Sequence, residues 1–173
     1  MSDERTQQSG QETSDPDLLW KLIKDIKFAM FTTRHASHLH SRPMTTQNQA
    51  QDRGDTLWFF MSRKSDPVDD FEHEPGVNVS YADPGADAYV SVAGDASVVD
   101  DQATKERLFT PMAKAWFPGG PTDPDLALVR VRIAHGNYWN VKENKVTQLF
   151  KMAKAAATGE PPKLGEHGEV RRN

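Results

Sequence analysis

The chain of 173 residues contains no cysteine, so neither a disulfide framework nor a thiolate nucleophile is available to it. It also lacks an apolar run long enough for a membrane span or a signal sequence. Runs of lysine and arginine never exceed two residues, and 21 basic against 25 acidic residues argue against a general nucleic-acid surface. These absences predict a soluble cytoplasmic protein, most simply a bacterial one, without a nucleic-acid or membrane partner.

Polar ends surround a more apolar middle, which explains the low mean hydropathy of −0.71. Residues 1–15 contain no aliphatic side chain beyond the initiator, and residues 161–173 contain only Leu164 and Val170. The length between them suits one domain with its own hydrophobic core. We therefore predict one domain over 16–160, flanked by loosely ordered tails at 1–15 and 161–173.

The hydrophobic pattern predicts a mainly β protein, a six-stranded antiparallel barrel with flanking helices. Strands are expected at 28–33, 41–47, 56–65, 77–81, 88–99 with a bend at Gly94, and in a last long strand around 129–133. Helices are expected at 17–27, 66–73, about 100–109 and 146–157, and a polar loop at His35, His38 and His40. The lack of a Gly-rich strand-to-helix fingerprint argues against a Rossmann unit.

The end of the strand at 56–65 carries a chemical signal. Its apolar side chains give way to the polar run Ser62–Ser65, whose hydroxyls and cations suit an anion. Asp66 and Pro67 then begin a helix, so backbone N–H groups point toward the same place. This arrangement predicts a phosphate site, with ordinary helix capping as the simpler alternative.

Several motifs occur in a fixed order along the chain. They are Ser41-Arg42-Pro43-Met44, Leu57–Phe60 followed by Ser62–Ser65, Val79–Pro84, Tyr89–Val92, Ala115–Gly120 and Tyr138-Trp139. The Trp-Phe-Pro-Gly-Gly sequence within Ala115–Gly120 is the most specific of them. Over roughly residues 17–160 the set resembles the general stress protein branch of the pyridoxamine 5'-phosphate oxidase-like, FMN-binding split barrels.

The resemblance implies a six-stranded split barrel and a homodimer, with FMN, or alternatively FAD, bound across the dimer interface. It matches Arg42 to the phosphate-binding arginine of the family, and Pro43 and Met44 to strand residues that run under the isoalloxazine ring. Phe60, Met61 and Ser62 match the strand whose backbone borders the ring.

The chain departs from this family at one position of the phosphate site. Where the branch has a lysine two residues after Ser65, this chain has Pro67. Arg63 or Lys64 is therefore left to replace that contact.

Aromatic residues outside these strands are further candidates for contact with the ring. Trp116 and Phe117 lie in a Pro-Gly loop, so we expect them over the ring or at the dimer interface. Trp139 suits ring stacking and core packing equally well. The run Trp58–Phe60 is expected to be mainly core. His38 and His40 could form a metal pair, but without an obvious third ligand we predict no metal site.

Three functions remain open from the sequence. They are a flavin-binding stress protein, a flavin-dependent oxidoreductase of a small molecule, and a flavin-free barrel that binds an apolar ligand or a partner protein. No catalytic triad or carboxylate pair stands out, so any chemistry is expected to come from the cofactor. Oxidation of pyridoxamine 5'-phosphate is not expected. The sequence shows no C-terminal Arg-Leu strand of the kind that oxidase has, and Arg130 and Arg132 are expected to point outward.

Overall fold

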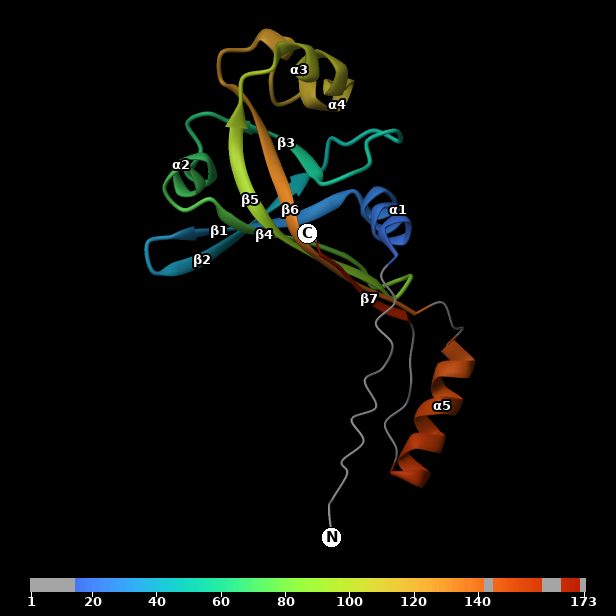
Figure 1. Cartoon of the computed structure of the whole chain (residues 1–173). Coiled ribbons are helices and arrows are strands. Elements are labelled where there is room, and N and C mark those ends of the chain that lie inside the picture. The colour runs from blue at the N-terminus through green and yellow to red at the C-terminus, as the bar shows by residue number, and fades with distance from the viewer. Residues whose placement is uncertain (1–14, 142–144, 160–165, 172–173) are drawn as a thin grey trace.

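One antiparallel sheet carries the fold (Figure 1), in a computed structural model that describes residues 15–141, 145–159 and 166–171. Its strands in these residues are β1 (Phe28–His35), β2 (His38–Thr45), β3 (Thr56–Ser62), β4 (Gly76–Asp83), β5 (Ala88–Val99), β6 (Leu126–Asn140) and β7 (Glu166–Arg171). The helices are α1 (Pro16–Ile26), α2 (Asp66–His73), α3 (Gln102–Leu108), α4 (Pro111–Lys114), η1 (Gly120–Thr122) and α5 (Lys145–Thr158). The strand order β2-β1-β4-β5-β6-β3 confirms the antiparallel split barrel, and β7 pairs with β6 beside it.

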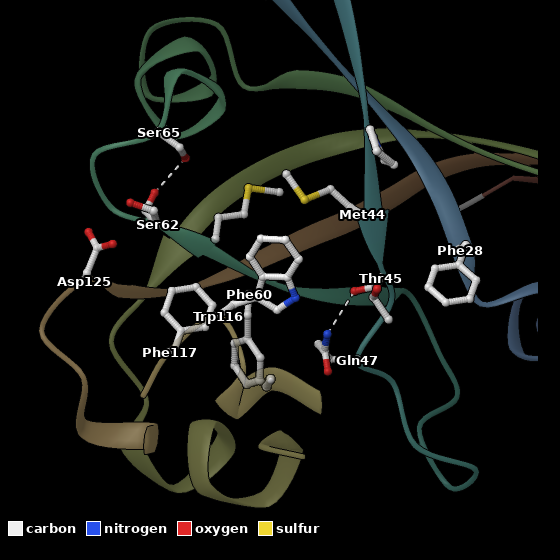
Figure 2. A pocket seen from close by; sticks show the side chains of 13 residues that line it. Phe28, Met44, Thr45, Gln47, Phe60, Ser62, Ser65, Trp116, Phe117 and Asp125 are labelled. Carbon is white, nitrogen blue, oxygen red and sulfur yellow. Dashed lines mark hydrogen bonds between the residues drawn. The ribbon is translucent and has the colours of Figure 1, made fainter. Parts of the chain in front are cut away.

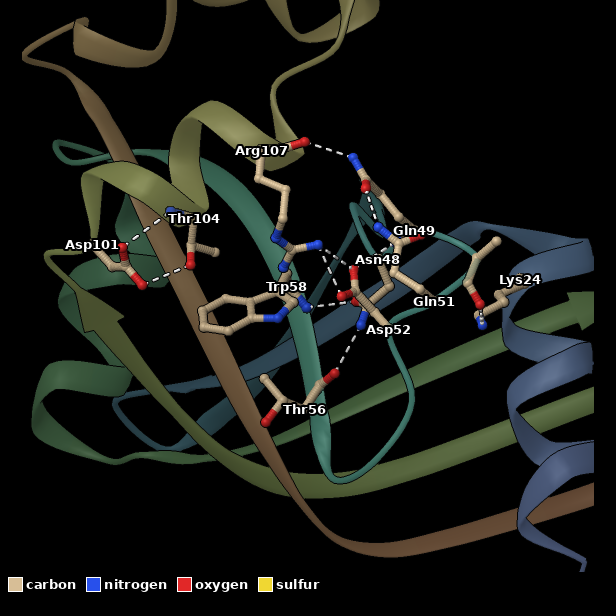
Figure 3. Close-up of polar contacts among 11 residues, drawn as sticks. Lys24, Asn48, Gln49, Gln51, Asp52, Thr56, Trp58, Asp101, Thr104 and Arg107 are labelled. Carbon is tan, nitrogen blue, oxygen red and sulfur yellow. Dashed lines mark hydrogen bonds and ion pairs between the residues drawn. The ribbon is translucent and has the colours of Figure 1, made fainter.

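The sheet curls so that its edge strands, β2 and β3, approach each other without forming a ladder in the described residues. Gly94 contributes to the curvature because the register of β5 against β6 shifts there, as the sequence predicted. The loop after β2 ties the two edges together. The Asn48 side chain accepts from the Trp58 N–H at 2.8 Å and donates to the Thr56 carbonyl at 2.9 Å (Figure 3).

The same loop is fastened to helix α3. Arg107 pairs with Asp52 at 2.9 and 3.1 Å, and the Gln49 side chain donates to the Arg107 carbonyl at 2.6 Å (Figure 3). These contacts connect the ends of β2 and β3 to the helical segment between β5 and β6. The split in the barrel is therefore held at a fixed width by polar contacts that the sequence pattern does not reveal.

Two apolar clusters stabilise the fold. In the larger one, α1 places Leu19, Trp20, Leu22 and Ile23 against the inner face of the sheet, each at most 6% exposed. Asp15 caps α1 by accepting from the Leu18 N–H at 3.0 Å. The smaller cluster joins β3, α3, the segment at α4 and the start of β6; it contains Phe60, Leu108, Ala113, Phe117, Leu126 and Leu128.

Two polar segments differ from the prediction. The expected loop at His35, His38 and His40 is a β-hairpin, with β1 and β2 joined by a tight turn in which Ala36 has a φ of 51°. Part of the expected C-terminal tail is strand β7, which pairs with β6 while Val170 packs against the core. Residues 1–14 of the predicted N-terminal tail lie outside the described residues.

Candidate functional site

A cavity of about 500 Å³ lies where the barrel is split, between the ends of β2 and β3 (Figure 2). Its lining residues are Phe28, Pro43, Met44, Thr45, Gln47, Phe60, Met61, Ser62, Ser65, Ala113, Trp116, Phe117 and Asp125. Most of these side chains are apolar, and the volume falls in the range of small-molecule sites. The cavity therefore has the size and lining of a ligand site.

The middle of the cavity is formed by aromatic and thioether side chains. Trp116 is 80% exposed, yet its ring lies over the cavity in Figure 2. Phe60 and Phe117 are each 8% exposed and form part of the wall, together with Met44 and Met61. Aromatic rings and thioethers pack well against flat rings, so this wall suits a planar ligand.

The polar end of the cavity lies where β3 passes into α2. Ser65, rather than Asp66, is the N-cap residue of α2, and its hydroxyl donates to the Ser62 carbonyl at 2.6 Å. Pro67 has no N–H, and the N–H groups of Val68 and Asp69 already donate to the Ser65 carbonyl, so Asp66 carries the N–H of the first turn that remains for a ligand. Asp125 faces the same end from the loop before β6 (Figure 2).

The cavity brings together seven of the eleven residues predicted for the site: Pro43, Met44, Phe60, Met61, Ser62, Ser65 and Trp116. Arg63 and Lys64 are exposed in the turn after β3 and do not line it. Arg42 does not line it either, although it lies on the same face of β2 as Met44.

Phe117, expected over the ring or at the dimer interface, also lines the cavity, and five further lining residues were not predicted as site residues: Phe28, Thr45, Gln47, Ala113 and Asp125. Strand register brings two of them to the cavity. Phe28 pairs with Thr45 across β1 and β2, and the pairing of Ser62 with Leu126 places Asp125 beside the end of β3. These residues could have been found only if the β1–β2 hairpin and the β3–β6 pairing had been predicted from the sequence.

Arg42 belongs to a polar cluster between β1, β2 and α2. Its Nη1 atom lies 3.8 Å from Asp70 Oδ2, is buried, and has no hydrogen-bond partner among the described residues. The buried Asp70 carboxylate accepts from Thr33 Oγ1 and bonds to His35 Nδ1, both at 2.6 Å. Burial opposes ionisation of Asp70, but these hydrogen bonds and the charges of His35 and Arg42 hold its pKa below the usual value.

The remaining predicted candidates lie away from the cavity. Trp139 stands at the far end of β6, 42% exposed, with its ring centroid 5.2 Å from that of His167. Arg130 and Arg132 alternate with buried β6 residues, as the sequence predicted, so their side chains lie on the outer face of the sheet. In the part of the chain that the structure describes, no three His, Cys, Asp or Glu side chains are placed to hold a metal ion.

The described helices include none that is both long and apolar enough to cross a membrane.

Comparison with known proteins identifies the family of the chain. The family model described as pyridoxamine 5'-phosphate oxidase like matches residues 15–163, which include every strand from β1 to β6. The protein bli-3 of Neurospora crassa is 29% identical over 154 residues, which cover 83% of this chain and 73% of that protein. Since this relative is fungal, the similarity is not confined to bacterial proteins.

Solved structures share the fold. A candidate general stress protein 26 from Jannaschia sp. CCS1 superposes with a TM-score of 0.68 at 23% identity, over 89% of this chain and 96% of that one. The general stress FMN/FAD binding protein of Xanthomonas citri gives a TM-score of 0.66 at 30% identity, over 75% of this chain and 90% of that one.

Proposed function

Because the chain belongs to the pyridoxamine 5'-phosphate oxidase-like family, in its general stress protein branch, we propose that it binds FMN in the cavity between β2 and β3. Pro43, Met44, Phe60 and Met61 would border the ring, and Trp116 would cover it. FAD is the alternative cofactor. The observation that carries the proposal is a cavity with an apolar middle lined by aromatic side chains and a polar end at the start of a helix.

One buried polar atom without a partner supports this ligand. Arg42 Nη1 is a buried donor that no described residue satisfies, and an unpaired buried donor is costly. Arg42 shares a face of β2 with Met44, and it lies beside α2, whose N-cap Ser65 lines the same cavity. A phosphate at this end would receive charge-assisted hydrogen bonds from Arg42. Arg63 or Lys64, which directly precede Ser65 in the sequence, would add a second cation.

When bound, the flavin would supply electron and hydride transfer, while the protein binds and orients it. Among the residues that line the cavity, Asp125 alone is ionisable, so the cavity wall offers little acid–base chemistry of its own. Trp116, which lies over the cavity, is 80% exposed, so this side of the cavity borders solvent, which favours a second candidate function, oxidation or reduction of a small molecule. Steady-state turnover with NAD(P)H above the free-flavin background would separate this candidate from a binding protein.

A homodimer is proposed because part of the outer face of the sheet is uncharged, although Asp95, Arg130 and Arg132 lie on that face further along β5 and β6. This uncharged outer face comprises Phe28, Met30, Thr32, Asn78, Ser80, Ala82, Tyr89, Ser91, Ala93, Asn137 and Trp139, which alternate with buried residues on β1, β4, β5 and β6. Depletion of charge is typical of the centre of a protein interface. Phe28 also lines the cavity, so a second copy on this face would border the flavin.

The test of the proposed function is flavin binding by the purified protein and its Arg42→Ala variant. We expect a flavin absorbance spectrum, and at least about tenfold weaker FMN binding in the variant, which corresponds to about 1.4 kcal/mol. Arg132→Ala removes an equal charge from an exposed position outside the cavity and should leave affinity unchanged. A colourless protein that takes up no added FMN would instead support the flavin-free barrel.

A further inference from the structure

Helix α5 turns its polar side toward the rest of the chain and leaves its apolar side in solvent. Gln148 and Lys151 are half-buried, and the Gln148 side chain donates to Asp87 Oδ2 at 3.3 Å, in the turn before β5. The exposed side carries an apolar stripe at helical spacing, which comprises Leu149 (69% exposed), Phe150 (73%), Met152 (53%), Ala153 and Ala156. An amphipathic helix ordinarily buries its apolar side, so a surface outside the described chain is needed to cover the α5 stripe.

The charges of α5 indicate what kind of surface this is. The helix contains three lysines and no acidic residue. Of the 21 basic residues of the chain, 18 therefore lie outside α5, against 25 acidic residues. A second α5 would repel the first, whereas the rest of a second copy has the opposite net charge and would attract it.

An anionic membrane would also attract lysines, but the geometry of α5 does not suit it. An interfacial helix keeps its cations beside the apolar side that enters the lipid. Here Lys151 is half-buried on the side that faces the chain, away from any surface that the stripe contacts. An anionic membrane would also repel the chain as a whole, whose net charge is −4.

The chain itself offers a matching surface at its other end. Met112 is 54% exposed and Trp116 is 80% exposed, and both line one small hollow beside the cavity. The segment 100–125 around them contains five acidic and three basic residues. Figure 1 shows α3 and α4 of this segment at one end of the sheet and α5 at the other. Within one chain the two exposed apolar surfaces are therefore apart.

We propose that α5 of one copy packs its apolar stripe on Met112 and Trp116 of a second copy. The inference rests on the homodimer of the proposed function and adds a contact to it. A two-fold axis that crosses the strands of the uncharged outer face exchanges the two ends of the sheet, and so brings each α5 to the α4 end of the other copy. Because Trp116 lies over the cavity, the partner's helix would border the cavity entrance, and each ligand site would be completed by the second copy (Figure 2).

Site-specific cross-linking tests the contact directly, because the chain has no cysteine of its own. The double variant Met112→Cys with Leu149→Cys, treated with a short bismaleimide, should give a covalent dimer. Each single variant should stay uncross-linked. Met112→Cys with Thr158→Cys is the matched control and should also stay uncross-linked, since Thr158 lies nine positions after Leu149 and thus on the opposite side of the helix.

A charge placed in the stripe gives an independent readout. Leu149→Glu should weaken the dimer at least about tenfold, because it brings an unpaired charge into an apolar contact. Thr158→Glu adds the same charge to the opposite side of α5 and should leave the dimer intact. At concentrations where the protein is monomeric, Leu149→Glu should not change the melting temperature, since Leu149 is exposed within one chain.

The possible failures are distinguishable. A monomeric wild type would reject the homodimer and the inference together. A wild type that binds no flavin but cross-links as expected would reject the cofactor and still support the contact. If the wild type is a dimer that binds FMN and the double variant does not cross-link, only the inference is overturned.

Three further results would assign the stripe to another surface and would each overturn the inference. A cross-link in Leu149→Cys alone would show that two α5 helices pair with each other. Sedimentation with phosphatidylcholine–phosphatidylserine vesicles by the wild type, but not by Leu149→Glu, would assign the stripe to a membrane. A lower melting temperature of monomeric Leu149→Glu would show that the stripe packs within its own chain.

Discussion

Asp70 shows how one buried carboxylate connects three elements of this protein. It lies on α2, bonds to Thr33 and His35 of β1, and faces Arg42 of β2. Removing one partner of such a group leaves a buried charge unpaired, which is more costly than the pair is stabilising. Asp70 therefore positions Arg42, the residue on which the proposed phosphate site depends.

The pH dependence of this cluster can be predicted. The hydrogen bond from His35 to Asp70 raises the pKa of His35 above its usual 6.5. Its contribution to stability is then complete below about pH 6.5 and is lost as the pH rises through the raised, folded-state pKa. The lowered pKa of Asp70 works in the other direction. Its contribution is present above the usual value of 3.8 and is lost as the pH falls through the folded-state pKa.

An NMR titration of the histidine ring protons checks this prediction. His35 should titrate above 6.5 in the wild type, and Asp70→Asn should return its pKa toward that value. A His35 pKa that is the same in the variant as in the wild type would contradict the assigned hydrogen bond.

Single residues of the site could be predicted where they are neighbours in the sequence. The segments around Pro43 and Ser62 each carry several site residues in sequence, so a local motif sufficed for them. Asp125 and Phe28 were missed because only strand register brings them to the cavity.

At the level of elements, the bulge in β5 explains the need for glycine at position 94. A Cβ atom on Gly94 would lie 2.2 Å from the carbonyl oxygen of Arg132 and 2.9 Å from its carbonyl carbon. Backbone atoms cannot move aside as a flexible side chain can. Gly94→Ala should therefore destabilise the protein by at least about 2 kcal/mol.

Urea unfolding of two alanine variants measures this effect. Gly76, at the start of β4, has no atom within 4 Å of a Cβ built on it, so Gly76→Ala is a matched control. We expect the free energy of unfolding to change little in the control and to fall clearly in Gly94→Ala. Equal stabilities for the two variants would mean that the bulge can relax without cost.

Most elements could be predicted because their apolar residues repeat with the period of a helix or a strand. The helices α1 and α5 and the strand β5 lie within a residue or two of the expected bounds. The hairpin of β1 and β2 was missed at its tip because β2 is exposed from His38 to Ser41, so no alternation marks it. Strand β7 was missed because its polar sequence acquires order only through pairing with β6.

For the whole molecule, the uncharged outer face leads to a prediction about assembly. Met30 lies on β1 within this face and is 43% exposed in the single chain. Met30→Glu would bury a charge if a second copy covers the face, and an unpaired buried charge is costly. Light scattering should show a dimer for the wild type and a shift toward monomer for the variant.

Gln51→Glu adds the same charge on an exposed loop and is the control for this assembly test. It should leave the dimer intact. A wild type that is monomeric at micromolar concentration in the presence of flavin would contradict both the dimer and a cofactor site shared between subunits.

Oxidation of pyridoxamine 5'-phosphate is still not expected of this chain, but one of the reasons taken from the sequence has to be changed. A C-terminal strand does exist, but Arg171 of β7 pairs with Glu169 of the same strand. Arg130 and Arg132 leave the inner face of β6, and no basic residue lines the cavity. A second phosphate pocket facing the ring is therefore missing from the described residues.

Anaerobic mixing of the FMN-loaded protein with pyridoxamine 5'-phosphate tests this expectation. The visible absorbance of the flavin should persist, and no aldehyde product should form. Bleaching of the flavin together with aldehyde formation would show that a substrate pocket exists.

The pairing of β3 with β6 determines when the cavity can form during folding. Ser62 pairs with Leu126 and Thr56 with Arg132, 64 and 76 positions further along the chain, whereas β1 and β2 pair as a local hairpin. Long-range pairing of this kind is slow, because the entropy of closing the loop is lost before the contacts form. A nascent chain that has not yet reached residue 132 therefore has no completed cavity, and a ligand of the cavity can bind only near the end of synthesis.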